Sequence, residues 1–109
     1  MSSMDFPGRE RRSPRVSIRL EAGYEDAERQ VFLPTRDLSE GGVFLLSEDP
    51  PDLGAPARVL LELPGQPVLL RLHGVVARRE PGAGFAFHFD SERLPEEARR
   101  ALRSVTAQR

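Results

Sequence analysis

The sequence has 109 residues, no cysteine and a formal net charge of −1. This length suits one domain with a core of its own, and the lack of cysteine excludes disulfides and thiolate chemistry. The balanced charge argues against a general nucleic-acid binder, and no apolar run approaches the ~18 residues that span a bilayer, so we predict a cytoplasmic protein without membrane insertion.

The first 14 residues are rich in Ser, Pro, Gly and Arg and contain few apolar side chains. Pro14 opposes a helix at the end of this stretch. We therefore predict a flexible basic arm over residues 1–14 and a single folded domain over residues 15–109.

Residues 15–20 carry the first pattern of period two. Val16, Ile18 and Leu20 fall on one face of an extended segment, with polar side chains between them, which predicts a half-buried strand. The acidic stretch that follows, residues 21–28, is expected to be a loop with a hairpin-like turn.

Later segments repeat apolar runs between stretches rich in Gly, Pro and Asp, at the spacing of a small all-β domain. Pro34 favours a sheet edge or a bulge, and Gly74 a bulge or bend. With residues 15–20, these strands predict an antiparallel barrel or sandwich. The further strands are expected at residues 29–38, 43–47, 57–64, 68–80 and 84–89, with core faces formed by Leu70, Leu72 and Val76 and by Phe85, Phe87 and Phe89.

The last segment changes to a helical period and predicts an α-helix over about 92–107. Glu96 and Glu97 near its start and several arginines later agree with the helix dipole. We expect this helix to cover one mouth of the barrel. Its apolar face is formed by Leu94, Ala98, Ala101, Leu102 and Val105.

The sequence offers no positive support for catalysis or for a metal site. Its two histidines, His73 and His88, lie inside expected strands, and neither has a second ligand at metal-binding spacing. Ser39 lacks the context of a nucleophile elbow. We therefore predict that the protein is not an enzyme.

Two short motifs suit an anionic, planar ligand. Arg11 and Arg15 are spaced R-x-x-x-R, and guanidinium groups pair bidentately with phosphates or with the O6 and N7 atoms of guanine. Such spacing also arises by accident in a chain with 16 basic residues, all of them arginine.

The second motif, D-x-S-x-x-G, has two interpretations. Asp37 and Ser39 can bond local backbone N–H groups in a plain turn, with Gly41 or Gly42 at positive φ. Alternatively, the carboxylate accepts the N1 and N2 hydrogens of guanine, and the glycines let a base or phosphate approach the backbone.

Together the two motifs resemble those of the PilZ domain family. The resemblance covers nearly the whole chain, including the segments DLSEGGVFL and GFAFHF and the C-terminal helix. It implies a six-stranded antiparallel β-barrel with a C-terminal α-helix, and the ligand cyclic di-GMP without any further cofactor. The implied ligand-binding residues are Arg11, Arg15, Asp37, Ser39 and Gly42, with Arg12, Arg36 and Gly41 as adjacent candidates that the motifs do not specify.

The resemblance further implies a receptor or adaptor that passes its ligand state to a protein partner through a changed surface. The alternative from another class is a PilZ-like interaction module that binds a protein and no nucleotide. An enzyme ranks far below both.

Overall fold

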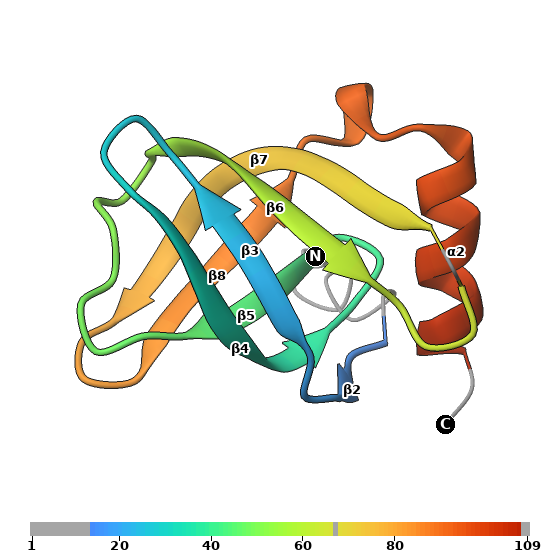
Figure 1. The fold of residues 1–109 in the computed structure, drawn as a ribbon, viewed down its shortest axis with the longest axis horizontal. Helices are drawn as coiled ribbons and strands as arrows, with labels where there is room; N and C mark the ends of the chain where they lie inside the picture. The colour runs from blue at the N-terminus through green and yellow to red at the C-terminus, as the bar shows by residue number, and fades with distance from the viewer. Residues whose placement is uncertain (1–13, 67, 108–109) are drawn as a thin grey trace, which may run out of the picture.

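The computed structural model describes residues 14–66 and 68–107 of the chain. Six strands curl into an antiparallel barrel, and one α-helix lies at its end (Figure 1). This confirms the fold expected from the sequence. The barrel strands are β3 (Glu21–Glu25), β4 (Gln30–Leu38), β5 (Gly42–Leu46), β6 (Pro56–Glu62), β7 (Leu69–Glu80) and β8 (Gly84–Phe89). A two-residue strand, β2 (Val16–Ser17), pairs with β4, and a 3-10 turn, η2 (Ser91–Arg93), precedes the helix α2 (Glu96–Thr106).

Around the ring the strands follow the order β4-β3-β6-β7-β8-β5, and pairing between β4 and β5 closes it. A turn over residues 63–66, after β6, contains Gly65, and the β7–β8 turn contains Gly82, with φ of 75° and 84°. Those left-handed conformations favour glycine. No helix in the described part of the chain is long and apolar enough to cross a membrane.

The prediction of a loop over residues 21–28 is wrong, because the first five of these residues form β3. Ala22 and Tyr24 are fully buried, whereas the acidic residues on either side of them, Glu21 and Glu25, are more exposed and hide the alternation. The turn itself is short. Asp26 sets it by accepting hydrogen bonds from the Tyr24 hydroxyl and from two backbone N–H groups that follow.

The strand expected over residues 15–20 is interrupted after Ser17. The Thr35 hydroxyl occupies the gap: it accepts a hydrogen bond from the Leu20 N–H (2.8 Å) and donates one to the Ile18 carbonyl (2.6 Å). The predicted alternation is nevertheless confirmed, because the apolar side chains of this segment pack against the core.

The two predicted irregularities had different outcomes. Beside Pro34, the β4–β5 register shifts between Thr35 and Asp37, as expected. Gly74 is not a bulge, since the register shift in β7 lies between Val76 and Arg78. Gly74 instead allows close approach, because a Cβ there would clash with the His88 carbonyl.

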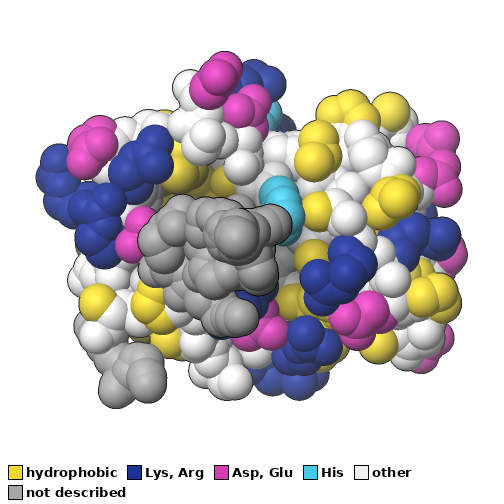
Figure 2. All heavy atoms as spheres, turned by 180° about the vertical axis from the view of Figure 1, so that it is seen from behind, with side chains coloured by type: hydrophobic (Ala, Val, Ile, Leu, Met, Phe, Trp, Pro, Cys, Tyr) yellow, Lys and Arg dark blue, Asp and Glu magenta, His cyan; other side chains and the backbone are white. Residues whose placement is uncertain are grey.

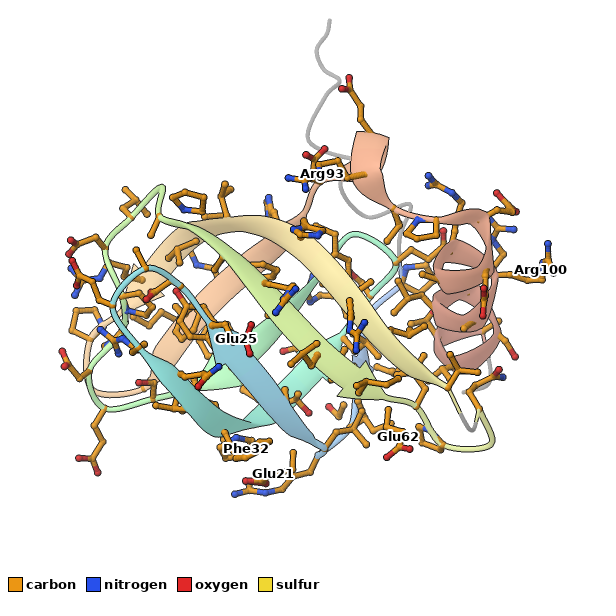
Figure 3. The ribbon with its side chains drawn as sticks, turned by 45° about the horizontal axis from the view of Figure 1, so that its top comes forward. Glu21, Glu25, Phe32, Glu62, Arg93 and Arg100 are labelled. Atoms are coloured by element: carbon orange, nitrogen blue, oxygen red, sulfur yellow. The ribbon has the colours of Figure 1, made fainter. Side chains whose placement is uncertain are left out.

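The barrel interior is aromatic at its centre and aliphatic toward the helix. Tyr24 meets Phe85 and Phe87 edge-to-face, at centroid distances of 5.4 and 6.5 Å. The predicted core faces of β7, β8 and the helix are confirmed, whereas Glu21, Phe32 and Arg100 point away from the barrel and helix (Figure 3). Buried helix residues in this core are Ala98, Ala101, Leu102 and Val105.

Candidate functional site

The structure brings together three of the residues that the sequence motifs singled out. Arg15 donates from Nε and Nη2 to Oδ1 of Asp37, at 2.9 and 2.7 Å, and its Nη1 lies 3.4 Å from Oγ of Ser39. Pairing of β2 with β4 causes this, since Ser17 lies opposite Asp37 and Arg15 precedes β2 directly. The R-x-x-x-R and D-x-S-x-x-G motifs therefore meet on one surface through Arg15.

Ser39 forms the turn after β4, as one interpretation of the motif expected. Its Oγ accepts hydrogen bonds from the N–H groups of Gly41 and Gly42, at 3.2 Å each. Asp37 takes no part in this turn and faces the guanidinium groups of Arg15 and Arg36. The expectation that Gly41 or Gly42 takes positive φ is wrong.

Gly42 is needed for a steric reason instead. It pairs with His88 on β8, and a Cβ at Gly42 would clash with the carbonyl oxygen of Phe87. The imidazole Cδ2 of His88 would lie 3.4 Å from that Cβ. Gly41 differs, because nothing lies within 4 Å of a Cβ there.

This contrast gives a matched pair of variants. Gly42→Ala is expected to lower the free energy of unfolding by about 1–3 kcal/mol, since β5 and β8 must move apart to admit the methyl group. Gly41→Ala is expected to change it by less than about 0.5 kcal/mol. Urea unfolding of both variants measures the difference, and equal midpoints would contradict the steric role of Gly42.

Charged side chains continue from Asp37 across the outside of the barrel. Arg36 donates from Nε to the second oxygen of Asp37 at 3.1 Å, and its Nη1 lies 3.7 Å from Glu80. The other Glu80 oxygen accepts from Nη2 of Arg78 at 3.0 Å. Five charged groups, from Arg15 to Arg78, are thus linked in series.

Phe44 lies under this series on the outer side of β5. The neighbouring residues in β5, Val43 and Leu45, belong to the barrel core, so the ring of Phe44 is on the opposite face. The Arg36 guanidinium lies 3.7 Å from the ring centroid and that of Arg78 lies 5.9 Å from it. Such contacts hold a guanidinium in place over an aromatic face.

His88 lies on the same surface. Burial lowers the pKa of its imidazole, and the positive charges of Arg15 and Arg78 lower it further. His88 follows Ala86 by two residues in β8, and Ala86 pairs with Phe44, so these side chains share one face of the sheet. β5 and β8 pass behind β3 and β6 in Figure 1, and the view from behind shows arginine and carboxylate side chains side by side in several places (Figure 2).

The other predicted residues have separate outcomes. Arg11 and Arg12 lie outside the described residues, as does the arm up to residue 13. Arg36 adjoins Asp37, and Gly41 contributes its N–H to the Ser39 turn. Phe44, Arg78 and Glu80 were missed, because only the register between distant strands brings them to Asp37.

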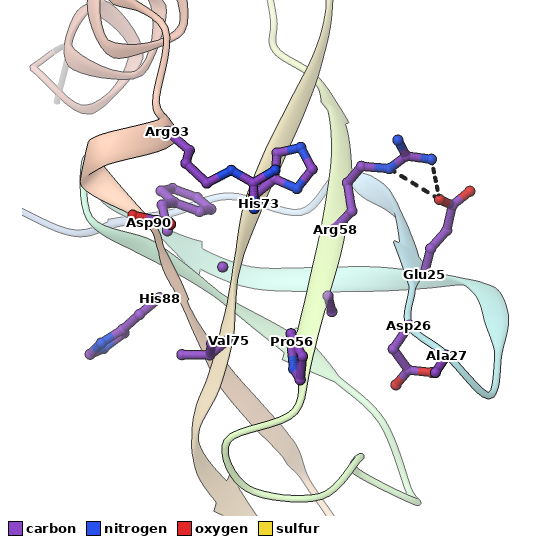
Figure 4. A pocket seen from close by; sticks show the side chains of 13 residues that line it. Glu25, Asp26, Ala27, Pro56, Arg58, His73, Val75, His88, Asp90 and Arg93 are labelled. Atoms are coloured by element: carbon purple, nitrogen blue, oxygen red, sulfur yellow. Dashed lines mark hydrogen bonds and ion pairs between the residues drawn. The ribbon is translucent and has the colours of Figure 1, made fainter.

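A larger hollow, of about 610 Å³, lies elsewhere on the barrel (Figure 4). Its charges are mixed and partly paired: Arg58 donates to Glu25 from Nε and Nη2, at 3.1 and 2.5 Å. His88 belongs to its lining, but Arg15, Asp37 and Ser39 do not. Among the described residues, no cluster of His, Asp and Glu could hold a metal ion.

Comparison with known proteins places these features in context. The sequence matches the PilZ domain over residues 9–108, which is most of its length. A search of curated proteins found no match.

Three solved structures share the fold. The inhibitor of motility MotI/DgrA of Bacillus subtilis superposes with a TM-score of 0.72 at 16% identity, covering 88% of this chain and 48% of that one. PlzA of Borreliella burgdorferi, in complex with c-di-GMP, superposes with a TM-score of 0.66 at 16% identity, covering 84% of this chain and 39% of that one. The PilZ domain of CeSA from a cellulose-synthesizing bacterium superposes with a TM-score of 0.63 at 22% identity, covering 84% of this chain and 93% of that one. The chain thus spans about half the length of the first two structures or less.

Proposed function

Since this chain belongs to the PilZ domain family, we propose that it is a receptor or adaptor that binds cyclic di-GMP and passes the bound state to a protein partner. The PilZ domain is typically a non-catalytic receptor module. The observation that supports the proposal most is the convergence of Arg15, Asp37 and Ser39 on one surface.

The chemistry of these groups suits guanine. A carboxylate such as Asp37 accepts the N1 and N2 hydrogens of the base, and a guanidinium such as Arg15 donates two parallel bonds to O6 and N7. The Arg15 side chain is 48% exposed and that of Asp37 is 16% exposed, so both can be reached from solvent. When the ligand binds, the Arg15 guanidinium replaces its hydrogen bonds to Asp37 by hydrogen bonds to the ligand.

We propose that the ligand site is formed by the motif residues Arg11, Arg15, Asp37, Ser39 and Gly42. Arg12, Arg36 and Gly41 are the adjacent candidates. Arg11 enters this set through the family motif alone. Ser39 and Gly42 keep the turn in place, and the arginines and Asp37 make the polar contacts. PlzA, whose structure holds c-di-GMP, has the same fold, which supports a ligand of this class.

Calorimetric titration with cyclic di-GMP, and with cyclic di-AMP as the matched control, tests the function. Cyclic di-GMP is expected to bind far more tightly, because adenine replaces the O6 acceptor by an N6 donor, at a cost of ~1–3 kcal/mol for each wrong edge. Asp37→Ala is expected to lose ~1.5–3 kcal/mol of binding while its melting temperature changes little. Equal affinity for the two dinucleotides would rule out this assignment.

One observation favours the alternative, an interaction module without nucleotide. Both oxygens of Asp37 already accept hydrogen bonds, from Arg15 and Arg36, so the cluster is stable without a ligand. If the protein is such a module, titration with either dinucleotide gives no heat of binding, and the only effect of Asp37→Ala is a lower melting temperature.

A further inference from the structure

We propose that Arg78 on β7 and His88 on β8 form a second side of the ligand site, beyond β5 from Asp37, and contact the phosphate groups of the bound dinucleotide. This inference rests on the proposed function and extends it to two residues that neither motif contains.

Strand register places these residues on one outward-facing row. Asp37 on β4 pairs with Phe44 on β5, Phe44 with Ala86 on β8, and Ala86 with Arg78 on β7. Three strand spacings separate the ends of this row, about 14 Å in all. That width matches a molecule with two bases joined by a ring of sugars and phosphates.

Small residues lie next to Phe44 in the middle of the row. Ala86 lies between Phe44 and Arg78, and Gly42 lies beside His88 in the neighbouring pair. Phe44 and Ala86 are only 1% and 5% exposed, and the Arg36 guanidinium covers the Phe44 ring, so a flat ligand that lies over β5 and β8 displaces Arg36 from that ring. At one side it meets Arg15 and Asp37, and at the other it meets Arg78.

Arg78 is held ready for such a contact. Its Nη2 donates to Glu80 at 3.0 Å, and its guanidinium lies 5.9 Å from the Phe44 ring centroid. The side chain is 59% exposed, which leaves further N–H donors open to solvent. Because its position is already restricted, less rotamer entropy is lost when a phosphate binds.

The electrostatics of the row favour an anion. The linked groups are three arginines, Arg15, Arg36 and Arg78, and two carboxylates, Asp37 and Glu80, so the positive charges are in excess. His88, which pairs with Gly42, adds a titratable group whose pKa is lowered by burial and by the charges of Arg15 and Arg78. Bound phosphates would offset those two charges and raise the pKa of His88, so protonation and binding would favour each other.

Other charged groups near His88 must be considered for this pH dependence. Asp90 follows β8 and Arg93 belongs to η2, and both line the same hollow as His88 together with His73, Arg58, Glu25 and Asp26. Glu25 pairs with Arg58, Asp26 accepts a hydrogen bond from the Tyr24 hydroxyl, and no carboxylate of this hollow shifts the pKa of His88. The cationic groups that act on His88 are those of the proposed site.

Titration of single variants with cyclic di-GMP tests the proposal. Arg78→Ala is expected to weaken binding about 10- to 100-fold, the effect of one lost charge-assisted bond. Arg78→Lys should recover only part of the affinity, because lysine keeps the charge without the planar fork. Arg71→Ala is the matched control: Arg71 is exposed on the same strand, away from this row, and its loss should leave affinity unchanged.

The His88→Gln variant tests the second residue. Wild-type affinity is expected to rise several-fold as the pH falls from 8 to 6, with proton uptake on binding, whereas the affinity of His88→Gln should stay level. Melting temperatures of all variants confirm that each is folded. If wild type binds and Asp37→Ala does not, yet Arg78→Ala binds as wild type, this inference is wrong and the proposed function stands. If wild type fails to bind, both fail.

Discussion

Arg15→Ala is expected to bind cyclic di-GMP at least about 100-fold more weakly than wild type. Arg15 donates from Nε and Nη2 to Asp37 and from Nη1 toward Ser39, so one side chain links both motifs. Losing two charge-assisted bonds to a ligand, at ~1.5–3 kcal/mol each, exceeds the 2.8 kcal/mol that corresponds to about 100-fold. Calorimetric titration measures the change directly.

The Lys variant separates charge from geometry at this position. Arg15→Lys should recover little affinity, because an ammonium cannot donate two parallel bonds. The free energy of unfolding is expected to change by ~1 kcal/mol at most, since the Arg15–Asp37 pair is partly exposed. Arg19→Ala, at an exposed position of the same segment, serves as the control. An Arg15→Lys protein that binds as wild type would mean that Arg15 acts only as a point charge.

Phe87→Ala is expected to lower the free energy of unfolding by about 3–5 kcal/mol. Its ring is fully buried, meets Tyr24 and Phe89 edge-to-face, and lies where β8 faces the barrel centre. Removing it leaves a cavity that the closed sheet cannot easily collapse. For a marginally stable domain, such a loss removes much of the total stability.

Phe32→Ala is the matched control for this core variant. Phe32 is the same residue type, but 73% of it is exposed, so its replacement should cost less than about 1 kcal/mol. Chemical denaturation of both proteins gives the comparison. Similar unfolding midpoints for the two would show that the aromatic centre does not hold the barrel together.

The fold was predictable from the sequence wherever the pattern is local. Alternation in residues 68–80 and 84–89 identified the inward faces of β7 and β8, and the change to a helical period identified α2. β3 was missed, because only Ala22 and Tyr24 mark its inner face and acidic residues flank them. Such a short strand is fixed by its two neighbours, β4 and β6, rather than by its own pattern.

The candidate site was predictable only in part, for the same reason. Spacing identified Arg15, Asp37 and Ser39, which β2–β4 pairing then brings together. The contacts that reach Arg78 depend on register across β4, β5, β8 and β7, which no local pattern contains. Arg11 and the behaviour of the arm stay predictions.

Closure of the sheet also limits how a partner protein can attach. Each of the six barrel strands pairs with a strand on either side over part of its length, with β4 paired to β5 from Thr35 to Leu38, and of the described strands only two-residue β2 has a single neighbour. Recruitment by strand addition, in which a peptide extends a sheet through main-chain hydrogen bonds, is thus confined to β2 and to the unpaired edges of staggered strands, such as that of residues 30–34 of β4. In the proposed receptor, a partner would then distinguish the ligand-bound from the free protein mainly by side chains and shape, which makes recognition depend more on residue identity than on backbone.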